Sequence, residues 1–199
     1  MGGGVMALEL NGTTGVSLVQ DGVVTAADLA DNAITSAKLF SGFANGIAEV
    51  DQYRITQDFA LADGAIVNNY WERINSDGFE KIGTGISESA GVFTVPSTGY
   101  WLVYITWSGK RTTAATDSMG MSLEYTSNNS SYSPAIEVLQ GGSTNHRTSG
   151  SGMHLFKVTD TSNQKFRCAM STVAGSGTEL FGSTDRIKTG ITFIKIGDT

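Results

Sequence analysis

The chain has 199 residues, which is enough for one domain of about 150 residues and an appendage. Charged residues make up only 16% of it, and 25 Gly against 2 Pro favour short strands with Gly-rich turns over helices. The net charge of -6 argues against nucleic acid as a partner, because phosphate backbones are bound by basic surfaces. No apolar run reaches the roughly 18 residues of a membrane span, and the first residues lack a secretion signal. We therefore expect neither membrane insertion nor conventional secretion.

The first 45 residues differ from the rest and are predicted to form a separate arm. Val24 and Ile34 begin two units of a decapeptide repeat that read β-branched, Thr, any residue, Ala, charged, Leu. One copy of this arm has too few large apolar groups to offset an ordering entropy of roughly 1 to 2 kcal/mol per residue. We expect it to be disordered, wound with copies of itself or docked on another protein. Met6 is an alternative start to Met1.

These repeats, together with the opening segment of residues 6–15, resemble tail-fibre and other virion appendage proteins of bacteriophages. The resemblance implies that the arm is a virion-attachment end and that residues 46–199 form an outward-facing knob. Its partners would then be other virion proteins, bound through the apolar side chains of the arm. These side chains are Leu8, Leu10, Val24, Leu29, Ile34 and Leu39.

From residue 49 onward the apolar residues recur with a period of two, which is typical of strands. Strands are predicted around residues 53–61, 65–74, 79–82, 92–95, 100–108, 118–126, 136–139, 153–159, 165–171 and 189–196. Eight to ten strands without a long helix predict an all-β sandwich of the jelly-roll type. In residues 118–126 the pattern is one-sided, so the side that carries Ser122 and Glu124 is expected to face water.

Residues 100–108 are apolar on both faces of the predicted strand. Trp101, Val103, Ile105 and Trp107 share one face, and Tyr100, Leu102 and Tyr104 share the other. Leaving either face in water would forfeit roughly 5 to 10 kcal/mol of burial free energy. We therefore expect the strand to be covered twice, by the opposite sheet and by a copy of the same domain.

The same stretch resembles a strand pair in the trimeric jelly rolls of the tumour necrosis factor superfamily and of the globular head of complement's first component. Phe93, Gly99 and Trp101 follow that pattern, although Val103 and Ile105 stand where the family prefers aromatics. The resemblance implies a homotrimer whose last strand lies beside the long strand. The predicted core and trimer-interface residues are Tyr100, Trp101, Leu102, Val103, Tyr104, Ile105, Trp107, Ile191 and Phe193.

No constellation of catalytic residues is found in the sequence, so we expect no enzyme activity and no cofactor. The two His residues are too few for a three-ligand zinc site, and the carboxylates are scattered, so no metal site is predicted. A calcium ion near a three-fold axis is left open. Cys168 alternates with apolar neighbours and is expected to be a small buried side chain.

Polar segments at 110–117, 127–134, 141–152 and 173–185 are predicted to be long surface loops, which commonly carry binding residues. A host-surface glycan or protein is the ligand considered, and the alternative is that these are solvated connections. The candidate receptor-binding residues are Lys110, Arg111, Tyr132, His146 and Arg147.

Together these features favour a non-enzymatic phage structural protein, assembled in the host cytoplasm and located in the virion. Its predicted role is that of a trimeric short tail fibre that adheres to the host surface through its knob. A capsid decoration or cement protein, or a head fibre, is the main alternative. A free lectin or signalling ligand and a glycan depolymerase are weaker alternatives.

Overall fold

The chain separates into two units, Met1–Phe43 and Ala44–Thr199, in a computed structural model. The structure describes residues 10–11, 15–16, 46–76, 78–112, 118–141, 144–173 and 177–199. In the first unit, strands β1 (Leu10–Asn11) and β2 (Gly15–Val16) pair antiparallel. Leu10 thus lies in β1, whereas the other predicted attachment residues lie outside the described part: Leu8, Val24, Leu29, Ile34 and Leu39.

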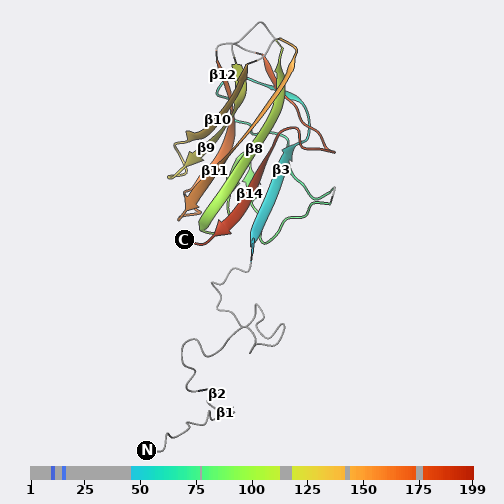
Figure 1. Ribbon diagram of the computed structural model, residues 1–199. Helices are drawn as coiled ribbons and strands as arrows, with labels where there is room; N and C mark the ends of the chain where they lie inside the picture. The colour runs from blue at the N-terminus through green and yellow to red at the C-terminus, as the bar shows by residue number, and fades with distance from the viewer. Residues whose placement is uncertain are drawn as a thin grey trace, which may run out of the picture. The chain divides into compact units, whose positions relative to one another are not determined.

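The second unit consists, in its described residues, of two antiparallel sheets (Figure 1). The five-stranded sheet has the order β10 (Ser133–Gly141), β9 (Ser118–Thr126), β12 (Lys165–Val173), β7 (Val92–Thr94), β6 (Ser87–Ser89). The seven-stranded sheet has β11 (Arg147–Val158), β8 (Gly99–Arg111), β14 (Gly190–Gly197), β3 (Glu49–Ile55) and β5 (Trp71–Arg73) side by side. Next to β8, the place of β14 is taken beyond its first residue, Gly190, by β13 (Thr178–Leu180). The short strand β4 (Phe59–Leu61) pairs with the other edge of β13. The predicted all-β jelly roll is confirmed.

The core lies between the two sheets. From β8 it receives Trp101, Val103, Ile105 and Trp107, all fully buried. The adjacent strand β14 contributes Ile191 and Phe193, and its place beside β8 is the one that the sequence predicts. The opposite sheet contributes Met119, Met121, Leu123, Phe166 and Cys168.

Two predicted strands are wrong. Residues 65–74 form a strand only at β5, because Tyr70 takes a left-handed conformation (φ 64°) that interrupts extended backbone. Residues 79–82 make only the isolated bridge from Ile82 to Val50. Conversely, β6 lies between the predicted strands 79–82 and 92–95, where the sequence predicts no strand.

The predicted loop at 141–152 is also largely wrong, because β11 begins at Arg147 and pairs with β8 along its length. The outer side of β9 departs from expectation too, since Ser122 is buried. Its short side chain lies between Glu137 of β10 and Ala169 of β12, and its hydroxyl donates to the Ala169 carbonyl at 3.4 Å. Among the described residues, no helix is long and apolar enough to cross a membrane.

Candidate functional site

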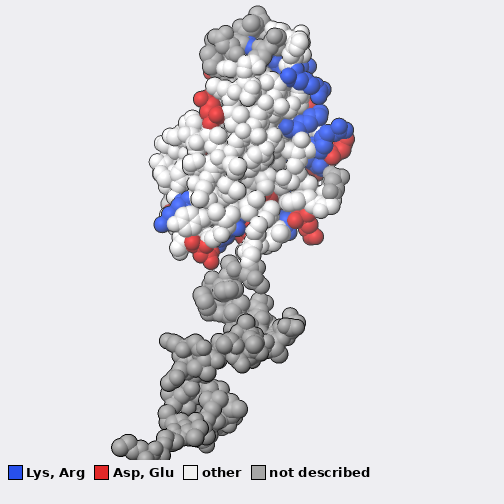
Figure 2. All heavy atoms as spheres, in the orientation of Figure 1, with Lys and Arg blue, Asp and Glu red and all other residues white. Residues whose placement is uncertain are grey.

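The outward side of the seven-stranded sheet carries a set of side chains without a charge. Residues directly opposite one another on neighbouring strands point to the same side, so the register defines rows across the sheet. One row runs Leu155, Leu102, Ile194, Val50, and the next runs Met153, Tyr104, Thr192, Gln52. Tyr100 borders these rows, and on its other side the Lys157 Nζ lies 5.9 Å from its ring centroid. We call the eight residues together with Tyr100 the uncharged face. Figure 2 shows the middle of the globular unit free of Lys, Arg, Asp and Glu in the view where Figure 1 places β8 and β14.

Within one chain this face remains partly open to solvent. Tyr100 is 36% exposed, Tyr104 37%, Leu155 48% and Met153 64%. The inner face of the long strand is covered by the opposite sheet, as predicted, and the cover of the outer face by a copy of the domain stays a prediction. Contiguous exposed apolar side chains of this kind are typical of interaction surfaces.

The predicted receptor-binding residues divide into two groups. Lys110 and Arg147 lie directly opposite each other on β8 and β11, and the exposed His146 precedes Arg147. Arg111 follows Lys110, but its side chain is buried at 2% exposure, so it does not belong to a surface site.

Tyr132 lies apart, beside the five-stranded sheet. Its ring stacks against the Arg167 guanidinium, 4.0 Å from the ring centroid, and Arg167 pairs with Glu124 at 2.6 Å. Burial raises the pKa of Tyr132 above its usual value, with Arg167 opposing that effect. The structure therefore does not bring Tyr132 together with Lys110 and Arg147.

A basic cluster forms around Phe181, which the sequence did not single out. Three cations lie close to its buried ring: the Arg147 guanidinium carbon at 4.6 Å from the ring centroid, the Lys110 Nζ at 5.7 Å and the Lys188 Nζ at 5.8 Å. We call Lys110, Arg147, Lys188 and Phe181 the Phe181 cluster. Figure 2 shows Lys and Arg gathered on the upper flank of the globular unit.

A buried polar network lies inside the sandwich and is structural. Asp51, fully buried, accepts from the Nε of Arg73 at 3.0 Å and from the backbone amide of Ile86 at 2.6 Å. The Tyr53 hydroxyl donates to the Ile86 carbonyl at 2.6 Å. Burial raises the pKa of Tyr53 to about 12, with Arg73 opposing and Asp51 reinforcing that effect.

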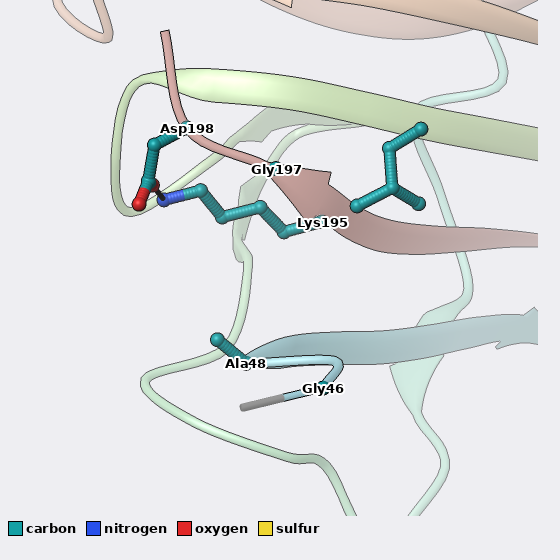
Figure 3. A pocket seen from close by; sticks show the side chains of 6 residues that line it. Gly46, Ala48, Lys195, Gly197 and Asp198 are labelled. Atoms are coloured by element: carbon teal, nitrogen blue, oxygen red, sulfur yellow. Dashed lines mark ion pairs between the residues drawn. The ribbon is translucent and has the colours of Figure 1, made fainter. Parts of the chain in front are cut away.

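The described residues also contain one small cavity and one buried thiol. A cavity of about 40 Å³ lies between Ala48 before β3 and Gly197 of β14 (Figure 3), and it has room for about one water molecule. The nearby Lys195 Nζ pairs with Asp198 at 2.6 Å. Burial raises the pKa of the Cys168 thiol far above its usual value, so it is a poor nucleophile. In the part of the chain that the structure describes, no three His, Cys, Asp or Glu residues gather to hold a metal ion.

No model of a protein family matches the sequence, and no curated protein sequence matches it. Solved structures do share its fold. Eiger TNF from S. frugiperda superposes with a TM-score of 0.57 at 14% identity, covering 75% of this chain and 93% of that chain. Murine APRIL at pH 5.0 gives a TM-score of 0.55 at 13% identity, covering 74% of this chain and 98% of that chain. Residues 44–199 therefore have the fold of a tumour necrosis factor-type jelly roll.

Proposed function

We propose that the chain is a non-enzymatic structural protein of a bacteriophage particle, a homotrimer whose arms attach to the virion and whose jelly-roll knobs adhere to the host surface. The observation that carries the assembly part is the uncharged face on a chain of net charge -6. Four large apolar side chains on it are at least 36% exposed in one chain. Burying each contributes on the order of 1 kcal/mol or more.

A second copy is the occupant that best fits this face. The solved structures with this fold cover three quarters of the chain, and the family resemblance of residues 93–105 implies trimers. A cyclic trimer closes an apolar sheet face without leaving an open end that would propagate into a fibre. Obligate interfaces of this kind are apolar, as this face is.

The virion role rests on the repeats of the arm. Their resemblance to phage appendage proteins supports an attachment end. A short tail fibre is the role we favour. The alternative is a capsid decoration protein or head fibre, which would have the same arm and knob but would be attached to the head of the particle.

The oligomeric state of the full chain tests the assembly. We expect light scattering coupled to size exclusion to give the mass of three chains. Leu155→Glu and Met153→Glu place a carboxylate on the uncharged face, where both side chains are exposed in one chain, so the domain itself should still fold. Both variants should run as monomers, because burying an unpaired charge costs several kcal/mol.

Ser89→Glu is the control, since Ser89 is exposed and lies on β6, the edge strand of the five-stranded sheet. It should leave the trimer intact. A wild-type chain that remains monomeric at high concentration would overturn the assembly proposal.

Labelling of intact phage particles with an antibody to the knob tests where the protein is located. Signal at the tail supports a tail fibre, and signal on the head identifies a decoration protein or head fibre. Particles that lack the protein would refute the virion role.

A further inference from the structure

The Phe181 cluster brings like charges together in a way that sheet stability does not require. Lys110 and Arg147 are directly opposite each other on neighbouring strands. Like charges in that position destabilise a sheet. Lys188 reaches the same ring from the segment that joins β13 to β14. The strands β8 and β11 and the segment before β14 therefore each place one cation beside the Phe181 ring.

The carboxylates around the cluster neutralise only part of this charge. Glu179 lies 3.5 Å from the Lys110 Nζ, and Asp58 lies 3.6 Å from the Lys188 Nζ. The described residues offer Arg147 no carboxylate at ion-pair distance. One positive charge is thus in excess here, on a chain whose overall charge is -6.

Arg147 is held in a geometry suited to an anion. Its guanidinium carbon lies 4.6 Å from the Phe181 centroid, which fixes one side of the group against an aromatic ring. A guanidinium in such a contact keeps N–H donors for two parallel hydrogen bonds to a carboxylate, sulfate or phosphate oxygen pair. Arg147 is exposed, and the Lys110 and Lys188 side chains retain 31% and 28% exposure, so an incoming anion can reach all three.

We propose that the Phe181 cluster is a surface site for the oxyanionic group of an acidic polysaccharide, a carboxylate or a sulfate, with Arg147 as its principal donor. The choice of a polysaccharide rests on the adhesion role proposed above, whereas the anion chemistry rests on the cluster alone. Lys110 and Lys188 supply charge to the same group. Phe181 holds the Arg147 guanidinium in place.

The test is calorimetric titration of the full chain with polygalacturonate, which carries carboxylates, and with dextran sulfate. We expect binding of at least one polymer, weakening as salt is added because exposed charges are screened. Arg147→Gln should reduce affinity about tenfold or more, since hydrogen bonds between charged groups contribute roughly 1.5 to 3 kcal/mol. Arg147→Lys keeps the charge but loses the planar fork, so it should also bind more weakly than the native chain.

Arg186→Gln is the matched control, because Arg186 is 72% exposed, pairs with Asp185 and does not contact the Phe181 ring. It removes the same charge from the neighbouring segment and should change affinity less than about twofold. Equal losses for Arg147→Gln and Arg186→Gln would mean that only net charge matters and would overturn the site, as would the absence of binding to both polymers. Light scattering on the same samples separates this outcome from a failure of the trimer proposal.

Discussion

Asp51 is a fully buried carboxylate that accepts hydrogen bonds from several donors, so its substitution is expected to lower the stability of the fold. It accepts from the Nε of Arg73 and from the backbone amides of Gln52 and Ile86. Asp51→Asn replaces one acceptor oxygen by a donor and removes the charge opposite Arg73. We expect the free energy of unfolding to fall by about 2 to 3 kcal/mol in urea titrations.

The control for that change is Asp185→Asn. Asp185 is 70% exposed and pairs with the exposed Arg186 at 3.5 Å, so its loss should leave the free energy of unfolding nearly unchanged. Similar effects at both positions would show that the buried network does not support the fold.

Ionisation of Tyr53 is expected to lower the stability of the fold at high pH. Its pKa is raised to about 12 by burial, whereas an unfolded chain ionises Tyr near 10. The folded state therefore holds the proton more tightly, so this contribution to stability is complete below pH 10 and is lost as the pH rises toward 12. We expect unfolding titrations to show a decline over that window that is smaller in Tyr53→Phe. An unchanged decline would assign the pH dependence to other groups.

At the scale of elements, β10 packs closely on β11 because glycines in β11 leave room for the side chains of β10. A Cβ at Gly150 would lie 2.6 Å from the Val138 Cγ1 and 3.0 Å from the Trp107 Nε1, which itself donates to the Val138 carbonyl. Gly150→Ala should therefore lower the free energy of unfolding by about 1 to 3 kcal/mol. Val138→Ala in the same chain should restore part of it, because it removes the methyl group in conflict.

Gly197→Ala is the comparison for that pair of variants. A Cβ at Gly197 meets no heavy atom within 4 Å, so this change should be close to neutral. A Gly150→Ala protein as stable as Gly197→Ala would show that the two strands can separate at no cost.

The length and the side-chain pattern of each strand explain whether the sequence predicts it. β8, β9, β12 and β14 each have large apolar residues at alternating positions, and all four were predicted within a few residues. The strands β6 and β13 were missed, because three residues are too few to display a period. Residues 53–61 were predicted as one strand, whereas the structure divides them between β3 and β4. The start of β11 is hidden because Gly150 and Gly152, which allow the close approach of β10, read as loop residues.

At the scale of the whole molecule, the basic cluster was half predictable. Lys110 and Arg147 were candidates because they lie in polar segments, but Phe181 and Lys188 join them only through pairing between distant strands. Nothing local in the sequence marks that convergence. The uncharged face was predicted from β8 alone, whereas its extension over Met153 and Leu155 required the register of β11.

Assembly should also couple stability to concentration. Because unfolding of a trimer separates its three chains, the thermal unfolding midpoint of the full chain rises with protein concentration by mass action. We expect that rise in calorimetric scans of the native chain and of Ser89→Glu, and no rise for Leu155→Glu. A midpoint independent of concentration in the native chain would indicate that a single copy is self-sufficient.

The pairing of β14 with β3 gives the globular unit a polarity. Glu49, near the point where residue 46 leads into the domain, lies opposite Lys195, which in turn lies opposite Trp101 at the start of β8. Lys110 lies toward the other end of that 13-residue strand, about 30 Å from Trp101 at roughly 3.3 Å per residue. Residue 46 and the carboxyl terminus thus lie at one pole of the globular unit (Figure 1), and the Phe181 cluster lies at the opposite pole. A fluorescent label or fused reporter added after Thr199 emerges far from the Phe181 cluster and leaves that pole unobstructed.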